Sequence, residues 1–464
     1  MPAQDLKKLL ERIHLRLDES FVGISSMVAD LAPADLAELF NQLTIPEAAA
    51  VVTMLPVQRV IEVFDQPTMR RRAAILGELE PVRAAEILTG LSADERTDII
   101  QRMNVHCRHR IVPKLSEEVR TELEGLLKYP QHTAGGIMTT EFVKLDVKMT
   151  VGEALKHIRA VAREKESIYA CYVLEPETDR LLGAISLRDL VMAELGSPIS
   201  EVMRRKPITV SALEDQESVA QKIGKYNLLA VPVLEQDGSV VGFVTVDDVI
   251  DVLIEEGTED ILRMAAVEPG ALDKPYLQIS LPSMIQKRAG WLVILFLGEM
   301  LTATAMGFFE KEIEKAVVLA LFVPLIISSG GNSGSQASTL VIRALALGEV
   351  SLRDWWRVMR REVFSGLGLG LILGAIGFLR ITIWSGFSNI YGPHWLLVAV
   401  TVGLALIGIV LWGTLSGSML PFMLRKLGFD PATSSAPFVA TLVDVTGLVI
   451  YFSVAFFILR GTLL

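Results

Sequence analysis

Five long apolar stretches after Ala289 constrain this chain more than any other feature of its sequence. Each approaches or exceeds the roughly 20 residues that a helix needs to cross a bilayer. They lie near Ala289–Phe309, Ala316–Ile342, Val363–Gly386, Trp395–Leu424 and Pro437–Leu459. Short polar links separate them, and a soluble protein has no core that would bury five such helices in succession. We therefore predict an all-α domain of five membrane-spanning helices over residues 289–464, surrounded by the lipid bilayer.

Basic residues in the short loops predict the orientation of these helices. They gather before the first stretch, between the second and third, and between the fourth and fifth, which places these junctions in the cytoplasm. They are Lys287, Arg288, Arg343, Arg353, Arg357, Arg360, Arg361, Arg425 and Lys426. The prediction is a multi-pass protein of the cytoplasmic membrane, with its amino terminus in the cytoplasm and its carboxyl terminus outside. We interpret Leu352–Glu362, which contains Trp355 and Trp356, as an interfacial helix.

The two parts of the chain differ in charge. Up to Arg288 there are 33 basic and 45 acidic residues, and after it 11 and 9, which gives −12 and +2. An acidic front part repels phosphate and attracts cations, so nucleic acid is excluded as a partner and divalent cations are favoured. The cysteines, Cys107 and Cys171, suit a reducing compartment. Cys107 has two histidines nearby but no orienting group, and we predict that the chain is not an enzyme.

Regularly spaced prolines mark the first 130 residues as a helical repeat. Proline is tolerated only in the first turn of a helix, so each proline marks a start. The predicted starts are Pro33, Pro46, Pro56, Pro67, Pro81 and Ser92. We predict a superhelical α-domain over residues 1–130, in which neighbouring units bury their apolar faces on one another.

Residues 131–257 contain a duplication. Gly183-Ala-Ile-Ser-Leu-Arg-Asp-Leu190 closes the first copy and Gly242-Phe-Val-Thr-Val-Asp-Asp-Val249 closes the second, each as a strand, a turn and a helix. The pattern resembles a tandem pair of cystathionine-β-synthase (CBS) domains, here an α/β pair at 131–199 and 200–257. In that resemblance, Ser186 with Arg188 and Asp189, and Thr245 with Asp248, match positions that contact a nucleotide such as ATP. The same residues also cap the following helix, and both interpretations stay open.

An acidic run follows the second copy. Seven of the fourteen residues from Asp247 to Asp260 are carboxylates and none is basic. Like charges repel on one face of the predicted helix, which carries Asp248, Asp251, Glu255 and Glu259. One interpretation is a solvated acidic face. The other is a sensor for divalent cations, and because the ligands are all oxygens the ion is Mg²⁺ or Ca²⁺.

Two polar features interrupt the apolar stretches. Asp444 lies deep in the fifth stretch, where an ionised residue costs roughly 2.5 to 3.5 kcal/mol. It is either an ion ligand or a structural carboxyl group that is protonated or paired with an arginine, for which Arg380 is the candidate. Ala440 lies one turn earlier on the same face. The second stretch contains the polar, glycine-rich run Ser328–Thr339, for which we predict irregular backbone along a hydrated path. Its candidate pore groups are Asn332, Ser335 and Gln336, with helix packing as the alternative.

The whole chain resembles the MgtE family of magnesium channels and transporters. The most specific matches are Gly330-Gly-Asn-Ser-Gly-Ser-Gln-Ala-Ser-Thr-Leu-Val-Ile-Arg-Ala-Leu345 and Pro437-Phe-Val-Ala-Thr-Leu-Val-Asp-Val-Thr-Gly447. The resemblance implies a homodimer with one pore on the two-fold axis, lined by Asp444 and the Ala440 carbonyl, with Asp430 at its cytoplasmic mouth. It also implies a connecting, or plug, helix over residues 258–288.

The same resemblance implies regulation by cytosolic Mg²⁺. The cation would bridge carboxylates of the helical domain, the CBS pair and the connecting helix, and would close the pore. The implied ligands are Asp94, Asp98, Asp248, Asp251, Glu256, Glu259 and Asp260. Three positions depart from the family pattern: Ala436, Asn227 and Glu299.

We therefore predict a multidomain membrane protein that takes up Mg²⁺ and is gated by cytosolic Mg²⁺. The alternative is a membrane-anchored sensor of divalent cations or nucleotides that conducts nothing. The polar second stretch favours conduction, because an anchor needs no Asn, Gln and Gly-Gly at membrane depth.

Overall fold

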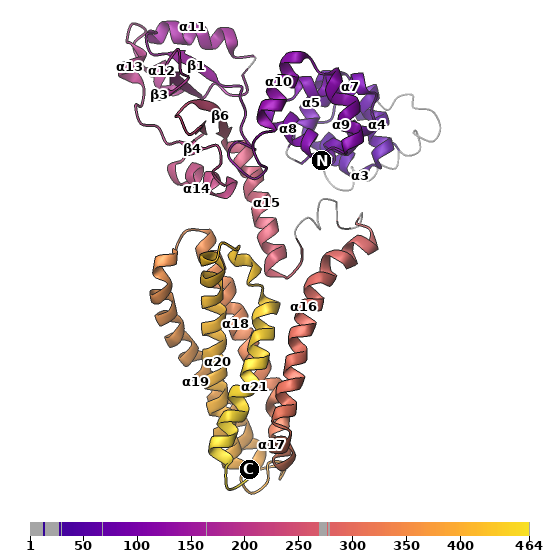
Figure 1. Ribbon diagram of the computed structural model, residues 1–464, viewed down its shortest axis with the longest axis vertical. Helices are drawn as coiled ribbons and strands as arrows, with labels where there is room; N and C mark the ends of the chain where they lie inside the picture. The colour runs from indigo at the N-terminus through magenta and orange to yellow at the C-terminus, as the bar shows by residue number, and fades with distance from the viewer. Residues whose placement is uncertain are drawn as a thin grey trace. The chain divides into compact units, whose positions relative to one another are not determined.

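The computed structural model describes residues 13, 27–28, 30–66, 68–163, 165–268, 276 and 279–463. They belong to two compact units, Met1–Glu256 and Gly257–Leu464. The first unit contains a helical layer and two small sheets, and the second contains the long apolar helices (Figure 1).

The helical layer consists of short helices that begin at or near the predicted proline positions. They are α3 (Pro33–Gln42), α4 (Ile45–Met54), α5 (Val57–Phe64), α6 (Arg72–Glu78), α7 (Pro81–Gly90), α8 (Ala93–Arg102), α9 (Val105–Ile111), η1 (Val112–Lys114) and α10 (Glu117–Leu126). α6 begins later than predicted, at Arg72, and Pro67 lies outside the described residues. One apolar face of each helix enters a common core that includes Leu36, Phe40 and Phe64.

The duplicated segment folds into two sheets of the same topology. In each sheet the first strand is parallel to the second and the second is antiparallel to the third. The strands are β1 (Val143–Asp146), β2 (Ala170–Leu174), β3 (Leu181–Ser186), β4 (Val210–Ser211), β5 (Ala230–Leu234) and β6 (Val240–Thr245), and the accompanying helices are α11 (Val151–Val161), α12 (Leu187–Met192), α13 (Ile199–Val202) and α14 (Gln216–Tyr226). Phe142, Tyr172 and Phe243 pack edge-on or tilted between the two copies, so that the sheets share one apolar interface.

A longer helix, α15 (Val246–Met264), follows β6 directly and carries the acidic run. It ends at Met264, and the next long helix, α16 (Leu281–Phe308), begins only at Leu281. The predicted connecting segment 258–288 is therefore not one helix. Its prolines at 269 and 275 lie outside the described residues.

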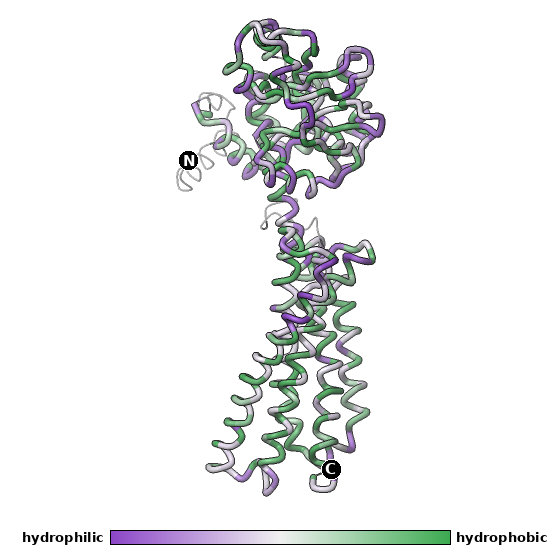
Figure 2. The backbone as a smooth tube through the Cα atoms, turned by 90° about the vertical axis from the view of Figure 1, so that its left-hand side faces the viewer, coloured by the Kyte–Doolittle hydropathy of each residue, from purple (hydrophilic) through white to green (hydrophobic). Residues whose placement is uncertain are grey.

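Among the described residues, five helices are long and apolar enough to cross a membrane, as predicted. Figure 2 shows their hydrophobic character along most of their length. The elements of this unit are α16, α17 (Glu310–Lys315), η3 (Val317–Phe322), α18 (Val323–Ala346), η4 (Leu352–Asp354), α19 (Trp355–Ser385), α20 (Trp395–Lys426), η5 (Pro431–Thr433) and α21 (Ala436–Leu459). The predicted interfacial helix at 352–362 is wrong as a separate element, because α19 runs without a break from Trp355 into the third span.

The polar run Ser328–Thr339 is regular helix, and the prediction of irregular backbone there is wrong. Its glycines let neighbouring helices approach α18 closely. A Cβ added at Gly417 of α20 would lie 2.0 Å from the carbonyl oxygen of Gly334, and one added at Gly413 would lie 2.4 Å from that of Gly330. Small residues thus serve helix packing here, as they do in other membrane bundles.

Candidate metal centre

Three carboxylates from three separate segments meet in the first unit. Asp94 lies in the first turn of α8, Glu166 lies between α11 and β2, and Asp248 lies in the first turn of α15. One ligand oxygen of each lies within 4.8 Å of the others. We call these three residues the acidic triad. Within the described residues it is the one group of three acidic, histidine or cysteine side chains that is close enough to hold a metal ion.

Local structure fixes two members of the triad. The backbone N–H of Thr245, at the end of β6, donates to Asp248 Oδ2 at 3.3 Å, and the Thr245 hydroxyl donates to the same oxygen. The backbone N–H of Glu166 donates to the carbonyl of Glu141 at 3.2 Å. This bond joins the segment of Glu166 to the segment that leads into β1.

Two carboxylate oxygens of the triad are buried and accept no hydrogen bond among the described residues. Asp94 is 9% exposed, and among the described residues its Oδ1 has no hydrogen-bond partner. Oε2 of Glu166 is also buried without a partner there. Buried carboxylate oxygens without donors are costly unless a cation occupies the space between them. Mg²⁺ prefers such oxygen ligands, and the three residues fit it.

Burial and neighbouring negative charges raise the pKa of each member of the triad. Burial is the larger cause for Asp94, whose pKa rises to about 6, and hydrogen bonds from Ser92 and from its own backbone oppose it. The pKa of Glu166 rises to about 9, through burial and then the charge of Asp94. The same two causes raise the pKa of Asp248 well above its usual range. The protein therefore favours a proton or a cation at each site over a bare charge.

These pKa values predict how pH affects the cation-free protein. Between about pH 4 and pH 9 the folded triad retains protons that the unfolded chain releases, so the free energy of unfolding should fall as pH rises through this window. Thermal unfolding in a chelator measures this fall. Added Mg²⁺ should stabilise the protein more at about pH 8 than at about pH 6, because it binds the deprotonated oxygens.

Glu166→Gln is the control for this dependence, since it removes the group with the pKa of about 9. In this variant the decrease in stability above about pH 7 should become shallower. An unfolding temperature of the unsubstituted protein that does not change over the window would contradict the prediction.

The other predicted regulatory carboxylates have other neighbours. Asp98 accepts from Arg102 Nε at 2.7 Å, Glu256 accepts from Gln216 Nε2 at 2.6 Å, and Glu259 pairs with Arg263 one turn later on α15. Asp260 follows Glu259 on the same helix. The guanidinium group of Arg263 thus offsets part of the charge repulsion within the acidic run.

Burial raises the pKa of Asp251, and the nearby guanidinium of Arg72 opposes this shift. Arg72 also pairs with Glu95 of α8.

The structure brings Asp94 and Asp248 together and adds Glu166, which sequence reasoning missed. Glu166 lies in an irregular segment with no motif, and nothing in its sequence context indicates its neighbours.

Asp444 lies on α21, half-buried, where α18 passes closely. A Cβ added at Gly331 of α18 would lie 3.5 Å from Asp444 Oδ1 and 3.4 Å from Ala440 Cβ. Among the described residues no ion pair joins Asp444 to Arg380, whose guanidinium lies over the ring of Trp384 instead. The structure therefore gives no support to the paired structural interpretation of Asp444.

Polar side chains of α18 lie beside this position. Asn332, Gln336 and Thr339 are exposed on the single chain, and Asn332 Nδ2 donates to Ser328 Oγ at 3.3 Å. Glu299, on α16, is exposed as well, and the neighbouring Gly298 packs against Thr441 of α21. An exposed polar helix face at membrane depth is stable only against water or another chain.

The loop before α21 is fixed by polar contacts. Asp430 accepts from the backbone N–H of Ala432 at 2.7 Å and pairs with Arg263. Ser338 of α18 donates to the carbonyl of Ser434 at 2.9 Å, and Ser335 donates to the carbonyl of Ala436 at 3.1 Å. Backbone carbonyls therefore hold the start of α21, and the side chain at position 436 is not needed for this contact.

The predicted nucleotide-contact residues serve as helix caps. The backbone N–H of Asp189 donates to Ser186 Oγ at 3.0 Å, and the hydroxyl donates to Asp189 Oδ2 at 2.7 Å. Arg188 is exposed beside them.

Asn227, a departure from the family pattern, ends α14 in the left-handed conformation with φ 51°, which asparagine tolerates well.

Comparison with known proteins identifies the family. The model for the MgtE divalent cation transporter matches residues 323–454, that for the MgtE intracellular N domain matches residues 31–132, and that for the CBS domain matches residues 134–196 and 199–255. A magnesium transporter MgtE of Thermus thermophilus is 40% identical over 442 residues, which are 95% of this chain and 96% of that protein. The chain belongs to the MgtE family.

Other MgtE proteins extend the comparison. The magnesium transporter MgtE of Bacillus subtilis is 28% identical over 449 residues and covers 96% of both chains. A crystal structure of the cytosolic domain of the Mg²⁺ channel MgtE in complex with ATP is 34% identical, covers 52% of this chain and 99% of that one, and has a TM-score of 0.48. In this chain the MgtE transporter model covers the part of α21 that carries Asp444.

Proposed function

We propose that this MgtE protein carries Mg²⁺ into the cell across the cytoplasmic membrane and that cytosolic Mg²⁺ closes it. The observation that carries the transport part is Asp444, an acidic side chain at membrane depth with no ion-pair partner among the described residues. An intramembrane carboxylate of this kind is costly unless it binds an ion or its waters. The magnesium transport of its relatives supports Mg²⁺ as the substrate.

In the proposed pathway two copies of the chain face each other across a two-fold axis. Each contributes Asp444, the Ala440 carbonyl and the exposed polar face of α18. Mg²⁺ gives up its hydration shell reluctantly, so a wide site of two carboxylates suits a partly hydrated ion. The amino terminus is proposed to be cytoplasmic, which places the acidic triad where it samples the transported ion.

The proposed regulation starts at the acidic triad. When the triad is empty, its like charges oppose the approach of α8 to the start of α15, and a bound divalent cation reverses the sign of this interaction. α15 runs from the triad to Arg263, which pairs with Asp430 just before α21. Cation binding at one end of α15 is thus proposed to bias the helix that carries Asp444.

We propose ATP as an additional ligand at Arg188 and Asp189. Both are exposed at the end of β3, where a carboxylate accepts hydrogen bonds from a ribose and an arginine pairs with phosphate. Binding of ATP to the purified protein, lost on Asp189→Ala, tests this assignment. No ATP binding at millimolar nucleotide would contradict it.

Rescue of a bacterial strain that lacks its own Mg²⁺ transporters tests the proposed function. Expression of the chain should restore growth at low external Mg²⁺ and raise cellular Mg²⁺. Failure to restore growth, with the protein present in the membrane, would favour the alternative of a sensor that conducts nothing.

A further inference from the structure

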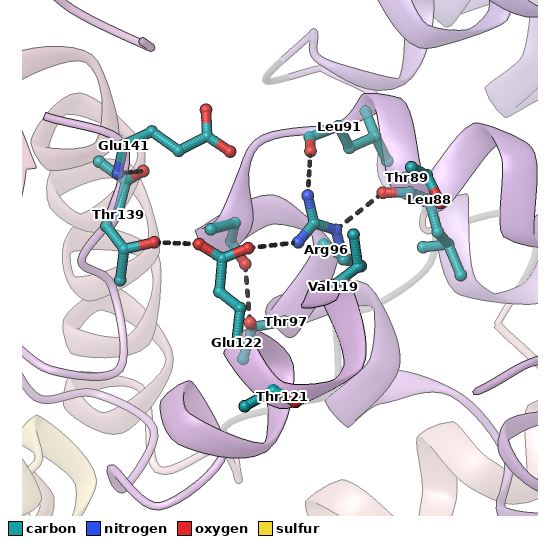
Figure 3. Close-up of polar contacts among 12 residues, drawn as sticks. Leu88, Thr89, Leu91, Arg96, Thr97, Val119, Thr121, Glu122, Thr139 and Glu141 are labelled. Carbon is teal, nitrogen blue, oxygen red and sulfur yellow. Dashed lines mark hydrogen bonds and ion pairs between the residues drawn. The ribbon is translucent and has the colours of Figure 1, made fainter. Parts of the chain in front are cut away.

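A chain of polar contacts begins at a buried arginine two residues after Asp94. Arg96 of α8 is 3% exposed, and its guanidinium donates three hydrogen bonds (Figure 3). Nε donates to the carbonyl of Leu88 at 2.9 Å, and Nη2 donates to that of Leu91 at 2.8 Å. Nη1 pairs with Glu122 Oε2 of α10 at 3.0 Å. Arg96 therefore closes the end of α7 and ties α8 to α10.

The same chain continues into the CBS pair. The second carboxylate oxygen of Glu122, Oε1, accepts a hydrogen bond from the hydroxyl of Thr140. Thr140 lies in the segment that leads into β1. Its neighbour Thr139 exchanges backbone hydrogen bonds of 2.9 and 3.0 Å with Phe243 of β6. One step further, the carbonyl of Glu141 accepts from the N–H of Glu166.

These contacts connect both sides of the acidic triad. On one side Arg96 shares α8 with Asp94. On the other side the segment of Thr140 is bonded to β6, which leads directly into Asp248, and to Glu166. The hydrogen bond from Thr140 to Glu122 joins the two sides without any metal ion. A hydroxyl bond to a carboxylate, here one that also pairs with Arg96, is stronger than a bond between neutral groups.

We propose that Glu122 and Thr140 form a latch that holds Asp94 against Glu166 and Asp248 and so sets the Mg²⁺ concentration at which the triad fills. The proposal rests on the proposed function, in which the triad is the regulatory site. Glu122 and Thr140 are positioning residues, since neither belongs to the triad.

We call the arrangement in which Asp94 lies against Glu166 and Asp248 the closed arrangement. The latch raises the fraction of molecules in this arrangement. Without a cation the charges of the triad favour separation, and the latch opposes it. A ligand that binds only the closed arrangement has an apparent dissociation constant equal to its intrinsic value divided by the closed fraction. Loss of a hydrogen bond to a charged group changes such a fraction about tenfold.

The latch differs from the contacts that hold each domain together. The bonds from Arg96 to Leu88 and Leu91 satisfy the carbonyls at the end of α7 and serve the fold of the helical layer. The bond from Thr140 to Glu122 joins the helical layer to the segment entering the first sheet and closes no helix end. A substitution at Thr140 should therefore change the position of Asp94 relative to Glu166 and Asp248 without changing the stability of the helical layer.

Thr140→Val in the full-length protein tests the latch. The readout is the Mg²⁺ concentration that gives half-maximal protection from proteolysis in detergent solution, and the variant should raise it about tenfold. Thr140→Ser keeps the hydroxyl and should restore the original midpoint. Thr121→Val is the matched control. The Thr121 hydroxyl donates within α10, to the carbonyl of Glu117, and the midpoint of this variant should not change.

A purely structural role of Thr140 would lower stability equally with and without Mg²⁺ and leave the midpoint unchanged, which would overturn the latch alone. If Thr140→Val does not fold, Glu122→Gln replaces it with the same expected shift. Asp248→Asn should abolish the Mg²⁺ response of the triad. If Asp248→Asn and the unsubstituted protein respond alike, the triad is not the regulatory site, and the proposed function and the latch both fail.

Discussion

Replacing Asp444 by asparagine should reduce Mg²⁺ uptake to about 1% of the unsubstituted rate or less. The amide has nearly the shape of the carboxylate but carries no charge. Loss of one direct charge contact in a site of low dielectric constant costs roughly 3 kcal/mol, and each 1.4 kcal/mol is about a tenfold change. Uptake into cells that lack other Mg²⁺ transporters measures the effect, with the amount of protein in the membrane determined in parallel.

Ser453→Ala provides a matched control on the same helix. Its hydroxyl donates to the carbonyl of Val449, within α21, and the variant should transport normally. Normal uptake by Asp444→Asn would show that the carboxylate is not needed for the passage of the ion, and the pore assignment would then be wrong.

Neutralising the acidic triad should leave transport active at Mg²⁺ concentrations that close the unsubstituted protein. The change is Asp94→Asn with Glu166→Gln and Asp248→Asn, which keeps the side-chain shapes. Without charge the triad neither repels when empty nor attracts a divalent cation, so closure should need at least about tenfold more Mg²⁺. Current or flux at increasing cytosolic Mg²⁺ measures this shift.

Asp237→Asn is the control for the effect of charge alone. Asp237 lies in the turn between β5 and β6 and accepts from the N–H and the hydroxyl of Ser239, at 2.9 and 2.6 Å. Its replacement should leave the closing concentration unchanged. A triad variant that closes at the same Mg²⁺ concentration as the unsubstituted protein would assign the sensor to another group.

The sequence predicted those parts of the fold that local patterns determine. Apolar length predicted five spanning helices, and proline spacing predicted most helix starts of the helical layer. The duplicated strand and helix pattern predicted two sheets of equal topology. Each of these patterns acts within one element or one repeat, so no knowledge of distant contacts was needed.

The remaining features depend on contacts between distant segments. Glycine and serine in Ser328–Thr339 suggested irregular backbone, but close packing of α18 against α20 and α21 keeps the segment helical. The long basic segment after Asp354 continues into α19, because nothing in it breaks the helix.

The candidate site shows the same division. Asp94 and Asp248 were predicted from the resemblance, whereas Glu166 meets them only because the Thr139–Glu141 segment is bonded both to β6 and to Glu166. The pair of Asp98 with Arg102 lies within α8 and follows from their spacing, whereas the pair of Arg263 with Asp430 joins segments far apart in the sequence. An ion pair between distant segments cannot be predicted from the sequence around either of its two residues.

Flux of Mg²⁺ through the purified protein in liposomes, with the Mg²⁺ concentration varied on the side that holds the acidic triad, tests the central claim most directly. Proteoliposomes should pass Mg²⁺ when that side is depleted of the ion, and the flux should fall as Mg²⁺ is added there. Absence of flux, or a flux that does not change with Mg²⁺ on that side, would contradict an uptake pathway closed by its own substrate.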